Sequence, residues 1–259
     1  MTAAGVVMRR HDPHVVEVVL DRPDALNAVS TSLAQELTAV LAAVAADRET
    51  RSVVLSSSSA RAFCVGADLK ERANFSDDEL LAQRPAIRSL FSALLDMPQP
   101  TIAAVSGFAL GGGFELALSC DLIVADVTAV FGLPEVTVGL VPGGGGTQLL
   151  ARRVGLGTAT DLVLTGRKVA AREGVALGIV NRLATSVGDE ALAVALTIAA
   201  NAPLAVQAAK RALAAGFGLP LGEALSLEDA AWRVAAVSAD RREGIAAFVA
   251  KRPAVWSGE

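Results

Sequence analysis

Two glutamates lie in glycine-rich or apolar segments, where a carboxylate must be paired or must take part in chemistry. Glu115 follows three consecutive glycines, Gly111 to Gly113. Glu135 follows Pro134 within a mostly apolar run, residues 131–140. A carboxylate that is kept from water is pushed towards its neutral form, and this suits a general acid or base. The two residues therefore predict proton transfer to and from a substrate, although a surface glutamate at a strand edge is an alternative for Glu135.

The glycines before Glu115 are typical of an oxyanion hole, in which backbone N–H groups bind a negatively charged oxygen. A strand is expected over residues 101–105 and a helix from about Gly113, so free N–H groups at the helix start would face a negatively charged oxygen. Glycine lets a ligand approach the backbone closely. One such donor typically contributes roughly 10²–10³ in rate. Tight packing of the helix against a strand explains the same glycines equally well.

A second backbone donor is expected near Gly66, Ala67 and Asp68. This segment also follows a strand and precedes a charged, helix-like stretch, so one of its N–H groups could join the first donor. A turn or a helix cap is the competing explanation for this short motif.

The sequence lacks the motifs that other classes of enzyme require. The loop from Pro142 to Thr147 has four glycines but not the Gly-Lys-Ser/Thr ending of a phosphate-binding P-loop, and residues 111–113 lack dinucleotide-binding spacing. The only histidines, His11 and His14, are both near the N-terminus. We therefore expect no metal site, no Ser-His-Asp triad and no cysteine nucleophile.

Composition indicates a folded protein with a large aliphatic core. Of 259 residues, 53% are hydrophobic but only 4% are aromatic, and the formal net charge is −4. The negative charge argues against nucleic-acid binding. No apolar run suits a transmembrane helix or a signal peptide. A soluble, reduced, cytoplasmic protein is expected, with Cys64 and Cys120 as small buried residues.

The elements that position the glutamates alternate between strand and helix. Strands are predicted at 14–20, 52–56, 101–105, 122–125, 130–132 and 179–183, and helices at 31–47, 78–96, 113–119, 201–216, 220–238 and 240–250. This order predicts an α/β core over residues 1–198 and a C-terminal helical region over residues 199–259. The apolar side of that region needs a partner surface, either the core or another subunit.

Taken together, these motifs resemble the enoyl-CoA hydratase/isomerase (crotonase) family over nearly the whole chain. The similarity runs from residues 21–28, Asp-Arg-Pro-Asp-Ala-Leu-Asn-Ala, to the Lys-Arg-Pro at residues 251–253. It implies a spiral of ββα turns, followed by helices that form a trimer or a dimer of trimers. It also implies an acyl-CoA thioester as substrate, in pathways such as fatty-acid β-oxidation, with no separate cofactor and no metal.

The resemblance assigns roles to particular residues. The catalytic glutamates match Glu115 and Glu135, and the two oxyanion-hole N–H groups match Ala67 and Gly112. Contacts to substrate or CoA are implied for Ala25, Ala62, Gly66, Asp68, Leu69, Lys70, Gly111, Pro134, Gly143, Phe248 and Lys251, the last two reaching a neighbouring subunit's ligand. Asp24 stands where many relatives carry a basic residue, so one contact to CoA is in doubt.

The implied reaction is syn addition of water to a 2-enoyl-CoA to give a 3-hydroxyacyl-CoA. Glu115 would deprotonate the water and Glu135 would protonate the α carbon, although the two could share these tasks. The residues at 67–72 also resemble methylglutaconyl-CoA hydratases of leucine breakdown, which act on a branched, acidic acyl group. A double-bond isomerase is a further alternative, since one carboxylate suffices to shuttle a proton.

Overall fold

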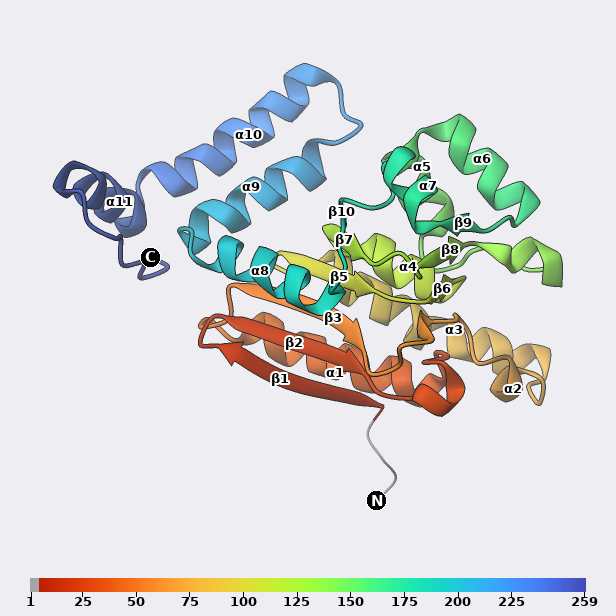
Figure 1. Cartoon of the computed structure of the whole chain (residues 1–259). Helices are drawn as coiled ribbons and strands as arrows, with labels where there is room; N and C mark the ends of the chain where they lie inside the picture. The colour runs from red at the N-terminus through yellow and green to blue at the C-terminus, as the bar shows by residue number, and fades with distance from the viewer. Residues whose placement is uncertain (1–4) are drawn as a thin grey trace.

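The computed structural model describes residues 5–259 and contains two β-sheets surrounded by helices (Figure 1). The larger sheet has the order β1-β2-β3-β5-β7-β10 and the smaller sheet the order β4-β6-β8-β9. The strands are β1 (Val6–Asp12), β2 (Val15–Leu20), β3 (Ser52–Ser57), β4 (Ala62–Cys64), β5 (Thr101–Val105), β6 (Phe108–Leu110), β7 (Leu122–Ala125), β8 (Val130–Gly132), β9 (Val169–Ala170) and β10 (Arg182–Leu183).

Helices occupy the intervals between the strands and all of the C-terminal part. They are α1 (Thr31–Ala46), α2 (Leu69–Arg72), α3 (Asp77–Leu95), α4 (Gly112–Ser119), α5 (Gly146–Val154), α6 (Leu156–Thr165), α7 (Ala171–Ala176), α8 (Val187–Ala199), α9 (Pro203–Gly216), α10 (Leu221–Ala236) and α11 (Ala239–Ala250). Two 3₁₀ helices, η1 (Pro23–Ala25) and η2 (Pro134–Val138), complete the regular structure.

Successive turns of the chain add one strand to each sheet. β3, β5 and β7 pair in parallel in the large sheet, and β4, β6 and β8, which follow each of them, pair in parallel in the small sheet. A helical segment then follows each pair: α2–α3, α4, and η2–α5. This is the predicted α/β spiral of ββα turns. It brings the ends of β4, β6 and β8, and therefore the segments that begin after them, to one side of the molecule.

The large sheet is buried on both faces because apolar residues alternate along its strands between two cores. Ala103 and Val105 of β5 pack into the main core, while Ile102 and Ala104 face a second core formed with α8. Both cores are aliphatic for the most part, as the composition indicates. Cys64 and Cys120 are free and buried, as expected.

The predicted elements are confirmed apart from small differences at their ends, with one exception. The strand expected over residues 179–183 covers only Arg182–Leu183. Ile179 and Val180 are buried, but they follow α7 in a turn, where Ile179 and Val180 N–H both donate to Gly174 O. The sequence analysis also missed β1, which contains His11, and the two- to three-residue strands of the small sheet, β4, β6 and β9.

Helices α9, α10 and α11 extend away from the sheets (Figure 1). Side chains such as Leu213, Leu221, Trp232 and Phe248 are more than half exposed. Helix α8 packs on the large sheet and ends at Ala199, so the predicted boundary between residues 198 and 199 lies at the last residue of this helix and stays a prediction. In residues 5–259, no single helix is long and apolar enough to cross a membrane, and only α8 and α9, bent by 108°, meet that test together.

Candidate active site

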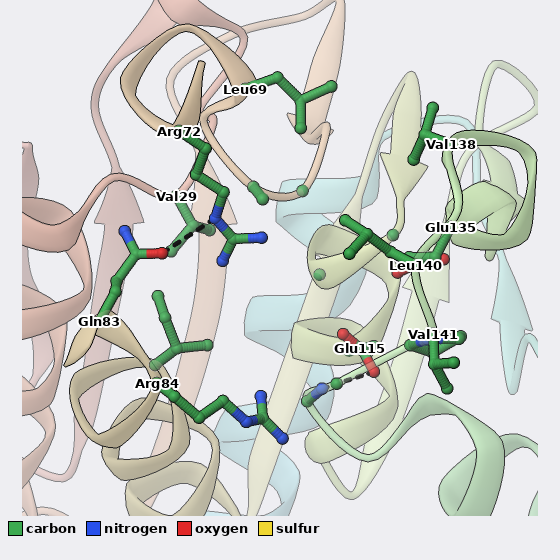
Figure 2. Close-up of a pocket in the computed structure, with 18 of the residues that line it drawn as sticks. Val29, Leu69, Arg72, Gln83, Arg84, Glu115, Glu135, Val138, Leu140 and Val141 are labelled. Carbon is green, nitrogen blue, oxygen red and sulfur yellow. Dashed lines mark hydrogen bonds between the residues drawn. The ribbon is translucent and has the colours of Figure 1, made fainter. Parts of the chain in front are cut away.

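A cavity of about 550 Å³ lies where the segments after β4, β6 and β8 meet. Figure 2 shows Glu115 and Glu135 on one side of it, and side chains of α2 and α3 on the opposite side. Much of its lining is apolar, including Val29, Leu140 and Val141. The cavity is therefore suited to a small organic group whose reactive part reaches two carboxylates.

Glu115 is buried in the first turn of α4 and its carboxylate is held by backbone donors. The N–H groups of Gly144 and Gly146 each donate to Glu115 Oε1 at 2.7 Å. Burial raises the pKa of Glu115, while these N–H groups and the Arg84 guanidinium act to lower it. The donors fix the carboxylate in one orientation and favour its ionised form over what burial alone would give.

Glu135 lies in η2 and has a different environment. It is half-buried, and its Oε2 atom is buried without a hydrogen-bond partner in the described structure. Burial and the nearby charge of Glu115 raise the pKa of Glu135 to about 7. A carboxyl group with this pKa is partly protonated at neutral pH, and so can donate a proton.

The three glycines at the start of α4 have different functions. A Cβ atom on Gly113 would lie 2.0 Å from Cys64 O, so this glycine permits close packing of α4 on β4. Gly111 has a φ of 52°, and a Cβ there would lie 3.0 Å from Glu135 Oε1. A Cβ on Gly112 meets nothing closer than 3.6 Å and would point into the cavity. Tight packing therefore explains Gly113, whereas Gly112 borders the cavity, where its part in an oxyanion hole stays a prediction.

Ala67 and Gly112 line the same part of the cavity. The Cβ position of Gly112 lies 3.9 Å from Ala67 N and 3.9 Å from Glu115 Oε2. Residues 66–68 are fixed by a bridge to Val29, in which Val29 N–H donates to Gly66 O and Asp68 N–H donates to Val29 O. This bridge uses the groups on either side of Ala67 N–H. Gly66 must be glycine here, because its φ is 90° and a Cβ would lie 2.8 Å from Leu110 O.

The structure brings together most of the predicted site residues. The cavity is lined by Gly66, Ala67, Leu69, Gly111, Gly112, Glu115, Pro134, Glu135 and Gly143. Asp68 instead caps α2 and forms an ion pair with Arg22, at 3.2 Å. Ala25 and the exposed Lys70 lie outside the lining, and Ala62 is fully buried in β4.

Phe248 and Lys251 do not reach the cavity within this chain. Both belong to the end of α11, which Figure 1 places at the opposite end of the molecule from α2. Phe248 is 85% exposed. Contact between these residues and a ligand therefore requires the cavity of another subunit, as the resemblance implied.

Three polar residues of the cavity wall were missed from the sequence: Arg72, Gln83 and Arg84. Helix 78–96 was expected to shape the substrate pocket, and α3 does so, but the polar residues on it were not recognised. A signal was available, because Arg84 follows Leu80 by four residues and precedes Ile87 by three, which places it on the apolar stripe of the helix. A charged residue on such a stripe calls for an explanation.

The described residues contain no group of three or more His, Cys, Asp or Glu side chains that could hold a metal ion. Cys64 and Cys120 are both buried, and burial raises the pKa of each thiol to about 12, so neither is a reactive thiolate. The polar groups that face the cavity beside Gly112 are thus two carboxylates and backbone N–H groups. A ββα spiral with two carboxylates and glycine backbone at one cavity is the arrangement that the resemblance to the crotonase family implied.

The comparisons with known proteins agree with this class. Residues 10–259 match the family model described as enoyl-CoA hydratase/isomerase, and the chain belongs to this family. It is 43% identical over 240 residues to a Rhizobium meliloti protein named "Probable enoyl-CoA hydratase", covering 92% of both chains. It is 37% identical over 251 residues to the mouse mitochondrial methylglutaconyl-CoA hydratase, covering 95% of this chain and 80% of that protein.

A solved structure confirms the fold. The crystal structure of an enoyl-CoA hydratase from Bacillus anthracis superposes with a TM-score of 0.96 at 38% sequence identity, covering 98% of this chain and 100% of that one. The protein is therefore an enzyme of the crotonase family.

Proposed function

We propose that this enzyme adds water to the double bond of a 2-enoyl-CoA and forms the 3-hydroxyacyl-CoA. The observation that carries the proposal is the pair of carboxylates in one cavity, of which Glu115 accepts two N–H bonds and Glu135 has a buried oxygen without a partner. Hydration requires a base for water and an acid for carbon, and these two environments provide one of each.

The thioester carbonyl would bind between Ala67 N–H and Gly112 N–H. When an oxygen attacks the β carbon, the electron pair of the double bond moves towards the carbonyl, which acquires enolate character. Two preorganised backbone donors stabilise that charge more than they stabilise the ground state, and this lowers the barrier. The orphan N–H groups at the start of α4 add to the favourable potential.

Glu115 would act as the base and Glu135 as the acid. Glu115 accepts a proton from water while the water oxygen bonds to the β carbon. Glu135 delivers its proton to the α carbon as the enolate collapses, and proton exchange with solvent restores both groups. The pKa of about 7 supports Glu135 in this task, because a carboxyl with an ordinary pKa would be almost fully ionised at neutral pH.

CoA would be the part of the substrate through which the enzyme binds it, and no separate cofactor would be needed. Lys70, exposed on α2 beside the cavity-lining Leu69, would meet CoA phosphates, and Lys251, with Phe248 beside it, would do so from a neighbouring subunit. The exposed apolar side chains of α9 to α11 support assembly into a trimer or a dimer of trimers through these helices.

The test is incubation of the purified enzyme with crotonyl-CoA. Loss of the ultraviolet absorbance of the conjugated thioester, with mass spectrometry showing a product one water heavier, is the expected result. Replacement of Glu49, which is exposed and outside the cavity, by Gln serves as a control and should leave the rate unchanged. Isomerisation of a 3-enoyl-CoA without any hydration would overturn the proposal.

A further inference from the structure

The wall of the cavity that faces the two glutamates carries two arginines. Arg72 ends α2 and Arg84 lies in the second turn of α3, and both line the cavity together with Gln83 (Figure 2). A pocket for a plain hydrocarbon chain has no need of positive charge. Two arginines in such a wall indicate that the ligand brings a negative charge.

Arg72 is held in position by a buried side chain. Its Nε donates to Gln83 Oε1 at 2.9 Å, and Gln83 is only 5% exposed. Gln83 Nε2 in turn donates to Thr31 Oγ1 at 2.7 Å and to Glu71 Oε2 at 3.1 Å. This network fixes one edge of the guanidinium. The two terminal nitrogens of Arg72 have no hydrogen-bond partner within residues 5–259, and so form a preorganised fork.

Arg84 is exposed to the cavity and has neither an ion pair nor a hydrogen bond in the described part of the chain. A Cβ on Gly143 would lie 2.8 Å from Arg84 Nη1, so this glycine leaves room for the guanidinium. Burial lowers the pKa of Arg72, the charge of Glu71 acts to raise it, and the charge of Arg84 acts to lower it, so the two guanidinium groups lie close enough to affect each other.

The two carboxylates whose charges act on this pair, Glu71 and Glu115, are hydrogen-bonded to other groups. Both Glu71 oxygens accept from Thr31 N–H, and Oε2 also accepts from Gln83. Glu115 Oε1 is occupied by Gly144 and Gly146, and burial still raises the pKa of Glu115 despite the charge of Arg84. Within residues 5–259, neither arginine therefore forms a hydrogen bond or an ion pair with a carboxylate.

We propose that Arg72 and Arg84 bind a carboxylate at the far end of the acyl chain, so that the preferred substrate is a 2-enoyl-CoA with an acidic terminus. This inference rests on the proposed hydratase function and names its substrate class. The thioester end would lie at Ala67 and Gly112, and the carboxylate would lie across the cavity, where a planar guanidinium can bind both of its oxygens. The apolar side chains Val29 and Ile87 would line the carbon chain between them.

The test compares two substrates of equal shape. Glutaconyl-CoA ends in a carboxylate, and its neutral counterpart carries an isopropyl group in the same place. We expect kcat/KM for glutaconyl-CoA to exceed that for the neutral thioester by about 10-fold or more, because charge-assisted bonds inside a cavity discriminate strongly against an apolar group. The same comparison with chains one methylene longer shows which length places the carboxylate best.

Variants then assign the preference to residues. Arg84→Met and Arg72→Met should each reduce the preference to near unity, because each slows the acidic substrate more than the neutral one. Arg84→Lys should retain part of it, since the charge remains but the fork is lost. Arg88→Met is the matched control, because Arg88 is exposed on the same helix and does not line the cavity.

Each outcome decides the inference. Equal kcat/KM values of the wild-type enzyme for the two substrates would overturn the inference while leaving hydration intact. Equal losses on both substrates in the variants would also overturn it, because they would assign the arginines to CoA or to Glu115.

Calorimetry of the saturated thioesters, glutaryl-CoA and its isopropyl counterpart, measures the preference without turnover. Tighter wild-type binding of glutaryl-CoA, lost in Arg84→Met, would support the arginine site even if no hydration were seen. Equal affinities would contradict it.

Discussion

Glu115 and Glu135 face the same cavity, but the segments around them differ in the hydrogen-bond donors that they offer the carboxylate. The glycine loop before α5 gives Glu115 two N–H donors at 2.7 Å. In η2, Glu135 has a buried oxygen with no donor, close enough to Glu115 for the charge of one to raise the pKa of the other. The two identical side chains therefore differ: N–H donors orient the Glu115 carboxylate and act to lower its pKa, whereas burial and the charge of Glu115 leave Glu135 partly protonated at neutral pH.

Loss of either carboxylate should have the largest effect. Glu115→Gln and Glu135→Gln each remove a proton-transfer group while keeping its shape, so each should lower kcat for hydration by at least ~10²-fold. Steady-state kinetics with crotonyl-CoA measure this, with circular dichroism to verify folding. A rate close to wild type in either variant would contradict the assignment of that residue.

Disturbing the donors of Glu115 should have a smaller effect, confined to one side of the comparison. A Cβ on Gly146 would lie 2.9 Å from Glu115 Oε1 and 3.0 Å from Leu133 Cδ1. Gly146→Ala should displace the carboxylate and lower kcat by about 10-fold or more. Gly157→Ala is the control, because a Cβ there meets nothing within 4 Å. Equal activities of the two variants would show that the N–H donors to Glu115 are unimportant for catalysis.

The pH profile should separate the two groups. Because Glu135 must be protonated to act as the acid, kcat/KM should decline above about pH 7, by about tenfold per pH unit, as the proton is lost. Protonation of Glu115 should produce the decline on the acidic side. A profile that is flat from pH 6 to pH 9 would be inconsistent with these roles.

Stability should respond to pH through Glu135 with a small but defined sign. A carboxyl whose pKa is raised by folding, here from 4.5 to about 7, binds its proton more tightly in the folded state. Wild-type stability should therefore fall as pH rises from about 4.5 to about 7, and Glu135→Gln should lack this loss. Relative to wild type, the variant should gain about 1–2 kcal/mol between pH 5 and pH 8 in urea unfolding. No relative gain would indicate that Glu135 is solvated.

The sequence predicted the location of the candidate catalytic residues better than the residues of the facing cavity wall. Glu115, Glu135, Ala67 and Gly112 belong to short motifs in which residue type and spacing carry the signal, and the structure places all four at one cavity. The small-sheet strands such as β4 and β6 were missed because three residues are too few to show an alternating pattern.

Arg72 and Arg84 were missed for a different reason. Their importance depends on which face of α2 and α3 points inward, and that is fixed by tertiary packing. Gln83 could not be recognised as the support of Arg72, since its partner Thr31 is 52 residues away in the chain. The subunit contacts of Lys251, the assembly and the cellular location are not tested by a single chain and stay predictions.

Exchange of the α proton tests the division of roles most directly. A saturated acyl-CoA cannot be hydrated, but an enzyme group beside the α carbon can exchange its α proton with D₂O, which nuclear magnetic resonance can follow. If Glu135 serves the α carbon and Glu115 serves water, Glu115→Gln should retain this exchange and Glu135→Gln should abolish it. Exchange that persists in Glu135→Gln and disappears in Glu115→Gln would contradict the account.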